Sequence, residues 1–326
     1  MRQSPLSIAI LSVSSLKIAK AFYGDLIGMD VCIRQSLGGH AFESHWALPE
    51  GSEAEAMLFS VEDSKVGRIL AIEFDAKDRK TIPQDGDRTY RGLWNLNFYV
   101  DDILMATKTL KAKGFTFWSE PVGYEVSAAA GQPVEVLFDG PDGLAINLVE
   151  LTGDASTVIG RLRKEVEEEG RTRNGFTPVA TTSHSIVDYD KALSFYQHVL
   201  GLSVMIDDVL DKPETNQFLD RPVGAKTRAT FMTSSHPFGK IVLSHPLNYE
   251  VPNKVDLAEA PNIGYLAQSF LVPDLEAALQ ISEGIGAELY SMPVDITLPG
   301  VGLRTAAIVR NPGSGALMEL IEEDPA

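Results

Sequence analysis

The alternation of apolar and polar positions repeats along the chain. Residues 12–31, SVSSLKIAKAFYGDLIGMDV, align with residues 185–204, SIVDYDKALSFYQHVLGLSV, at a constant offset of 173. In each copy, alternating apolar positions give way to apolar positions at helical spacing, and a glycine (Gly28 or Gly201) follows. This pattern predicts a strand followed by a short helix that ends at the glycine.

A second pair of repeated segments lies further along each half. Residues 95–117 align with 267–289 at an offset of 172, and the ends of the two halves, 143–151 and 315–323, agree at the same offset. Segments with strand character, separated by Gly, Pro and Asp, follow each predicted helix. The order of strand, helix and several strands therefore occurs four times, which predicts an α+β protein of four βαβββ modules.

The repeats suggest how the 326 residues divide into domains, for which two is the expected number. We predict an N-terminal domain at 1–152 with modules one and two, and a C-terminal domain at 176–326 with modules three and four. Residues 153–175 are charged and helix-prone, which predicts a linker helix on the surface. The segment 207–227 contains two prolines, and loops of its length are often lids or contact segments.

The composition of the chain limits the classes of molecule that we expect the protein to bind. The formal net charge of −17 opposes binding to nucleic acid and to anionic membrane surfaces. No apolar run approaches the ~20 residues of a membrane span. The single cysteine, Cys32, precludes an intrachain disulfide and fits the reducing cytoplasm; we interpret it as a small core residue. The expected partner is a small-molecule ligand, and a homodimer is left open.

Four sequence strings carry a family resemblance. They are SSLKIAKAFYGDLIGM (14–29), VDYDKALSFYQHVLGL (187–202), VPDLEAAL (272–279) and NPGSGALMELIE (311–322). They resemble the vicinal-oxygen-chelate superfamily of glyoxalases, bleomycin-resistance proteins and extradiol dioxygenases. The resemblance covers nearly the whole chain; it is diffuse at single positions but specific in order and spacing. It implies that paired modules form strongly curved sheets, each closing around a cup that binds a ligand.

The same resemblance implies where a metal would be held. Metal-containing members take one ligand from the first strand of each paired module and a carboxylate from the last strand. The corresponding positions are Thr181, Ala267 and Glu319 in the C-terminal half and Ile8, Asn95 and Asn147 in the N-terminal half. Ala and Ile cannot ligate a metal, and Thr and Asn are weak ligands. We therefore expect no metal cofactor, with divalent Fe, Mn or Zn as the alternative.

Alternation along the strands predicts which side chains face a cup. Candidate substrate-binding residues are Asn95, Asn97 and Asn147 in the N-terminal half, and Thr181, Ser183, Ser269, Arg304 and Tyr249 in the C-terminal half. Glu319 is the candidate general acid or base, because a carboxylate in a partly apolar cup has a raised pKa. Pairing with Arg304 is the alternative for Glu319. His245 is the candidate acid–base partner, whereas His184 is expected on the opposite face, against the helices.

These residues favour a metal-independent lyase or isomerase that moves protons on a small carbonyl-bearing or aromatic metabolite. One alternative is a non-catalytic small-molecule binding protein of the bleomycin-resistance type. Another is a metal-dependent extradiol-type dioxygenase or glyoxalase whose ligands lie at other positions. Fold resemblance by itself does not choose among these reactions.

Overall fold

Four modules with a shared order of elements make up the chain. The computed structural model describes residues 3–83 and 87–324. Module one comprises β1 (Ile8–Ser12), α1 (Leu16–Ala19), η1 (Lys20–Leu26), β2 (Asp30–Gly38), α2 (His40–His45), β3 (Glu53–Ser60) and β4 (Arg68–Phe74). The short strand β5 (Gly92–Leu93) leads into module two, which comprises β6 (Asn95–Tyr99), α3 (Ile103–Ala112), β7 (Val122–Gly123), β8 (Pro133–Asp139), η2 (Pro141–Gly143) and β9 (Ala145–Leu151).

The second half follows the same order. After α4 (Val158–Glu167), module three comprises β10 (Thr181–Ser185), α5 (Tyr189–Ser194), η3 (Phe195–Val199), β11 (Ser203–Leu210), α6 (Pro213–Phe218), β12 (Thr227–Thr233) and β13 (Lys240–Pro246). The turn η4 (Val255–Leu257) precedes module four, which comprises β14 (Gly264–Val272), α7 (Leu275–Gly284), β15 (Glu288–Leu298), β16 (Gly302–Arg310) and β17 (Leu317–Glu322). The four-module α+β fold predicted from the repeats is therefore confirmed.

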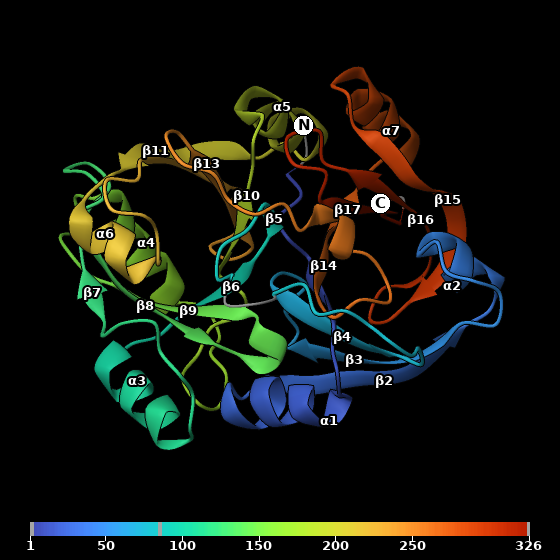
Figure 1. Ribbon diagram of the computed structural model, residues 1–326, viewed down its shortest axis with the longest axis horizontal. Helices are drawn as coiled ribbons and strands as arrows, with labels where there is room; N and C mark the ends of the chain where they lie inside the picture. Colours follow the sequence, from blue (N-terminus) through green and yellow to red (C-terminus); the bar gives the residue numbers. More distant parts are fainter. Residues whose placement is uncertain (1–2, 84–86, 325–326) are drawn as a thin grey trace.

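The strands form two curved sheets that lie side by side (Figure 1). One sheet has the order β15-β16-β17-β14-β1-β4-β3-β2, and the other has the order β11-β12-β13-β10-β6-β9-β8-β7. Module one thus shares a sheet with module four, and module two shares a sheet with module three. We call their concave faces the 1–4 cup and the 2–3 cup.

This arrangement corrects the expected pairing of module one with module two and of module three with module four. The first strands of the two modules in each sheet pair antiparallel, with Ile8 opposite Ser269 and Thr181 opposite Asn97. The boundaries at 1–152 and 176–326 therefore separate the sequence repeats, but each sheet takes strands from both halves. Because all four modules share one apolar pattern, the pattern does not specify which module pairs with which.

The helices pack against the convex faces of the sheets through aromatic side chains at repeated positions. Phe22 and Tyr23 of η1 and Phe195 and Tyr196 of η3 are almost fully buried in one continuous core. Burying each such side chain contributes roughly 1.5–3 kcal/mol. Asp102 and Asp274 cap α3 and α7 in the same way, each accepting a hydrogen bond from the backbone three residues on.

The side chain of His184 on β10 faces this helix layer, as predicted. Its Nδ1 is 2.9 Å from the Tyr196 hydroxyl, which in turn donates to Gln268 Oε1 at 2.7 Å. Burial, together with the positive charge of Arg91, lowers the pKa of His184 to about 3, so the ring is neutral at physiological pH. The network joins module three to module four through groups that carry no charge.

Two expectations about the surface are corrected. Cys32 on β2 is exposed and lies outside the core. The linker helix α4 is not a free surface helix, because Ile159, Leu162 and Val166 are buried along one of its faces.

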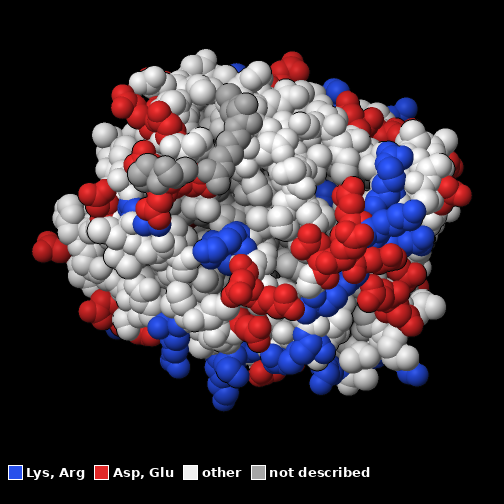
Figure 2. Space-filling model, turned by 180° about the vertical axis from the view of Figure 1, so that it is seen from behind, with Lys and Arg blue, Asp and Glu red and all other residues white. Residues whose placement is uncertain are grey.

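Among the described residues, no helix is long and apolar enough to cross a membrane. Figure 2 shows acidic and basic side chains interspersed on the face seen from behind.

Two glycines at equivalent positions allow the two halves to approach closely. Gly67 and Gly239 precede β4 and β13, and both have φ of 71°. A Cβ at Gly67 would lie 2.5 Å from the Val179 carbonyl oxygen, and one at Gly239 would lie 2.9 Å from that of Leu6. Neither contact could be relieved without moving backbone.

We predict that Gly67→Ala and Gly239→Ala each destabilise the fold by about 1–3 kcal/mol more than Gly51→Ala, because overpacking adds to the conformational cost. Gly51 is the matched control, since it also has a positive φ but a Cβ there would contact nothing within 4 Å. Urea denaturation monitored by circular dichroism would measure the difference. Equal losses for all three variants would contradict the close approach.

Candidate functional site

The 2–3 cup encloses a cavity. Side chains from strands β6, β8, β9, β10, β11, β12 and β13 form its walls, together with side chains from α4 and α6, which lie next to each other (Figure 1). The space that water-sized molecules can occupy is about 80 Å³. Because one water needs roughly 10–15 Å³ by this measure, the cavity has room for a small ligand. Much of the wall is apolar and aromatic, with Trp94, Tyr99, Tyr124, Phe218 and Phe231.

Five residues predicted from strand alternation line this cavity. They are Asn95, Asn97, Asn147, Thr181 and Ser183, which the sequence had divided between two cups. They meet because β6 and β10 are neighbours in one sheet. Asn95 Oδ1 accepts a hydrogen bond from the Ser183 backbone at 2.7 Å, so this side chain ties the two strands together. The part these five residues play in ligand binding stays a prediction.

Glu135 is the carboxylate of the cavity wall, and our sequence reasoning missed it. It lies on β8 and is half-buried, facing the cavity. The Tyr124 hydroxyl donates to its Oε1 at 2.7 Å, and Asn147 Nδ2 donates to its Oε2 at 2.6 Å. The segment QPVEVLFDG (132–140) held a usable signal, because a lone carboxylate interrupts an apolar alternating strand.

The surroundings of Glu135 suit proton transfer. Burial raises the pKa of its carboxyl group above the ordinary value, while the hydrogen bonds from Asn147 and Tyr124 and the charge of Arg221 act in the opposite direction. A carboxyl group whose pKa is shifted toward neutrality exchanges protons more readily at physiological pH. Burial also raises the pKa of Tyr124 well above its usual value, so the phenol stays protonated.

Arg221 brings a cation to the same cavity. It follows α6 within the segment 207–227, where the sequence predicted a lid or a contact loop. Its Nη2 donates to Ser244 Oγ at 3.2 Å, whereas its Nη1 has no hydrogen-bond partner among the described residues. Burial lowers the pKa of Arg221, although Tyr249, Tyr124 and Glu135 partly offset this effect. Tyr249 bonds to Thr227 at 2.7 Å beside Arg221, outside the cavity lining.

Glu319, the carboxylate predicted to be catalytic, lies in the 1–4 cup instead. Helix α2 fills that cup with Phe42, His45 and Trp46. His45 Nε2 is 2.8 Å from Glu319 Oε1, and both side chains are almost completely buried. The partner of Glu319 is therefore His45, rather than Arg304. Ser269 lies beside Glu319 on the neighbouring strand, and its hydroxyl has no partner among the described residues.

The structure brings neither His245 nor Arg304 to the cavity. On β13, alternation directs Ser244 inward, and His245 lies with its Nδ1 3.3 Å from the Ile186 carbonyl oxygen. Arg304 on β16 pairs with Asp324 near the end of the chain. The sequence could not exclude these two residues, because the phase of an alternating strand depends on which face its neighbours bury.

The donor groups in the 2–3 cup do not fit a transition-metal ion. In the 2–3 cup, the inward residues on the first and last strands include Asn97, Thr181, Asn147 and Ser244, all neutral oxygen or amide donors. Within residues 3–83 and 87–324, no group of three or more His, Cys, Asp or Glu side chains could hold a metal. Such ions usually take three or more strong protein ligands.

Comparisons with known proteins support the fold. Residues 6–148 match the model of the Glyoxalase/Bleomycin resistance protein/Dioxygenase superfamily. Glyoxalase I from Zea mays is similar over 98% of this chain and 92% of its own, with a TM-score of 0.62 and 16% identity. A putative dioxygenase from Bacillus subtilis is similar over 100% of this chain and 87% of its own, with a TM-score of 0.57 and 14% identity. No curated protein matches in sequence.

We predict that His45→Phe destabilises the protein by about 1–3 kcal/mol, because it leaves the Glu319 carboxyl group buried without its partner. His40→Phe is the control, since His40 begins the same helix but is exposed. The free energy of unfolding from chemical denaturation would measure both effects. Equal stability of the two variants would show that the buried pair contributes nothing.

Glu135 should make stability depend on pH. Because its pKa is raised in the folded state, the unfolded chain releases this proton more readily, so unfolding becomes easier as pH rises. Relative to Glu135→Gln, the wild type should lose stability from about pH 4.5 up through the folded pKa. The loss of stability should be about 1.4 kcal/mol for each unit by which folding raises the pKa of the Glu135 carboxyl group.

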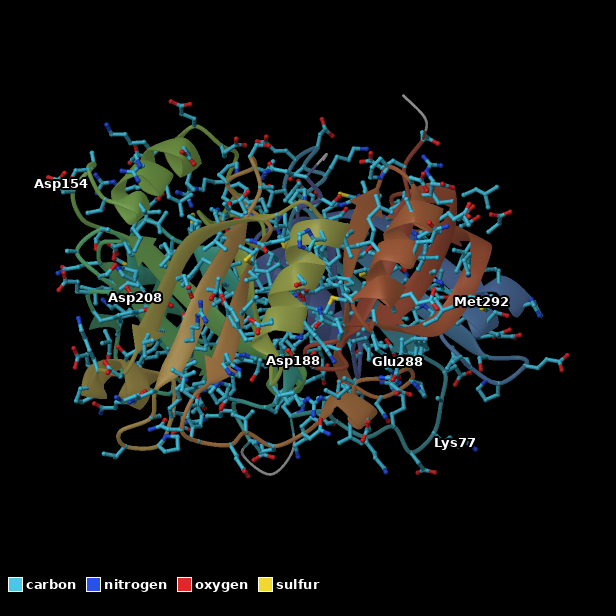
Figure 3. All side chains as sticks on the ribbon, turned by 90° about the horizontal axis from the view of Figure 1, so that it is seen from above. Lys77, Asp154, Asp188, Asp208, Glu288 and Met292 are labelled. Atoms are coloured by element: carbon cyan, nitrogen blue, oxygen red, sulfur yellow. The ribbon has the colours of Figure 1, made fainter. Side chains whose placement is uncertain are left out.

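An exposed carboxylate provides the control for this measurement. Glu288→Gln on β15 (Figure 3) should give a curve of stability against pH that runs parallel to that of the wild type. Urea denaturation at a series of pH values would supply the curves. A parallel curve for Glu135→Gln as well would contradict the raised pKa of Glu135.

Proposed function

Because residues 6–148 match the glyoxalase/bleomycin resistance protein/dioxygenase superfamily, we propose that the 2–3 cup binds a small carbonyl-bearing or aromatic metabolite and moves a proton on it. The reaction class would be that of a lyase or an isomerase. The observation that carries the proposal is Glu135, a carboxyl group with a raised pKa that faces a largely apolar cavity.

The residues around Glu135 have distinct tasks in such a reaction. The Glu135 carboxylate takes a proton from the carbon beside a carbonyl group, and the electron pair of the broken C–H bond moves toward the carbonyl oxygen. The guanidinium of Arg221 stabilises the negative charge that develops in the same low-dielectric space. Return of the proton to another carbon gives an isomerase, and loss of a neighbouring leaving group gives a lyase.

Neighbouring groups keep Glu135 in position for this transfer. Hydrogen bonds from Tyr124 and Asn147 fix both carboxyl oxygens. Helices α4 and α6 contribute Ile159, Leu162 and Phe218 to the cavity wall and so limit the access of water. Exclusion of water strengthens the electrostatic interactions inside the site.

A binding protein without turnover is the second candidate. It is favoured by the neutral amides and hydroxyls on β6, β9 and β10, which suit recognition of a polar ligand without chemistry. Native mass spectrometry of the purified protein, followed by mass spectrometry of the denatured protein, would identify a retained ligand under either function. Catalysed proton transfer would distinguish the enzyme from the binding protein.

We predict that the protein catalyses exchange of carbon-bound hydrogen for deuterium in a panel of small carbonyl compounds in D₂O, followed by NMR. Glu135→Gln should slow this exchange by about 10²- to 10⁴-fold, because it removes the acid–base group. Glu288→Gln should leave the rate unchanged. Exchange by neither wild type nor variant would favour the binding protein. Loss of exchange in Glu319→Gln, with Glu135→Gln still active, would place the chemistry in the 1–4 cup.

A further inference from the structure

Arg221 is a half-buried cation that faces the cavity of the 2–3 cup. Arg68 donates to the Gly300 carbonyl oxygen at 3.0 Å and to Ser7 Oγ at 2.8 Å. Arg310 pairs with Glu259, and Lys254 pairs with Asp87. By contrast, Arg221 interacts with the hydroxyl groups of Ser244 and Tyr249, and within the described part of the chain no ion pair joins it to a carboxylate.

The nearest candidate for a counterion is already occupied. Glu135 faces the same cavity, but its two oxygens accept hydrogen bonds from Tyr124 and Asn147. Its charge influences Arg221 across the cavity, without a direct pair between them. The Nη1 group of Arg221 is therefore a buried donor without an acceptor among the described residues, and this costs free energy until a ligand supplies one.

An acceptor for Arg221 would carry a negative charge. The other residues that line the cavity indicate which further groups such a ligand would have. Trp94, Tyr99 and Phe231 offer flat apolar walls. The Oδ1 atoms of Asn97 and Asn147 have no hydrogen-bond partner among the described residues and can accept from a hydroxyl or an N–H group. The free space of about 80 Å³ for water-sized molecules favours a small ligand.

We propose that the 2–3 cup takes a small monocarboxylate, whose carboxylate pairs with Arg221 while its ring or branched chain packs against the aromatic wall. This inference rests on the proposed function and specifies the substrate class of the same site. A guanidinium binds a carboxylate through two parallel hydrogen bonds, which gives it preference over a neutral amide of the same shape. The net charge of −17 does not oppose the pairing, because a buried local charge decides it.

Matched pairs of probes test the proposal. Isothermal titration at constant pH and ionic strength would compare benzoate with benzamide, and isobutyrate with isobutyramide. We expect wild type to bind at least one carboxylate about tenfold or more tightly than its amide. Arg221→Gln should bring the ratio within each pair close to one, and Arg221→Lys should keep part of the preference. Arg34→Gln, at an exposed position on β2, is the control and should behave as wild type.

The outcomes separate the substrate class from the reaction. Equal binding of carboxylates and amides by wild type, or binding of neither, would overturn the inference, whether or not Glu135 catalyses exchange in D₂O. Carboxylate preference that survives in a folded Arg221→Gln variant would also overturn it. Carboxylate preference that depends on Arg221, without any exchange in D₂O, would support the inference and refute the proton-transfer function.

Discussion

The architecture depends on a crossing of four backbone segments at the centre of the molecule. The Leu6 carbonyl oxygen accepts from the Gly67 amide at 3.0 Å, and the Leu6 amide donates to the Gly239 carbonyl oxygen at 3.1 Å. Val179 mirrors this arrangement, because its amide donates to Gly67 at 2.9 Å and its carbonyl oxygen accepts from Gly239 at 3.2 Å. Segments just before β1 and β10 are thereby held next to segments just before β4 and β13. With the pairing of β1 to β14 and of β6 to β10, this crossing joins the two halves of the chain.

The two cups built on this scaffold have different contents. In the 1–4 cup, α2 occupies the hollow and satisfies Glu319 with His45. In the 2–3 cup, α4 and α6 contribute to the wall, and free space remains between their side chains and those of the sheet. Whether a cup keeps free space is decided by the helices, which differ between the modules, and not by the strands, which share one pattern. A duplicated fold can thus have one closed, packed cup and one cup with room for a ligand.

The proposed chemistry of the 2–3 cup depends on two groups of opposite charge that are removed from water. The Glu135 carboxyl group and the Arg221 guanidinium face one small cavity, and burial disfavours the charged form of each. Tyr124 and Asn147 form hydrogen bonds with Glu135, and Ser244 accepts one from Arg221. The hydrogen-bonding capacity that remains on these two charged groups is available to a ligand in the cavity. This remaining capacity favours the 2–3 cup as the reaction site over the 1–4 cup, where Glu319 already has its partner.

The sequence by itself determined the four modules, the helix stops near Gly28 and Gly201, and the side of the strands on which Asn97, Thr181 and His184 lie. Periodicity carries that information, because it records which face of an element is buried. It did not determine the pairing of modules, nor that Glu135, Arg221 and Asn147 meet, because residues far apart in the chain become neighbours only through hydrogen bonding between strands and the docking of helices. The tertiary structure decided which cup kept its cavity, since the path of α2, α4 and α6 across the sheets has no signature in the repeat.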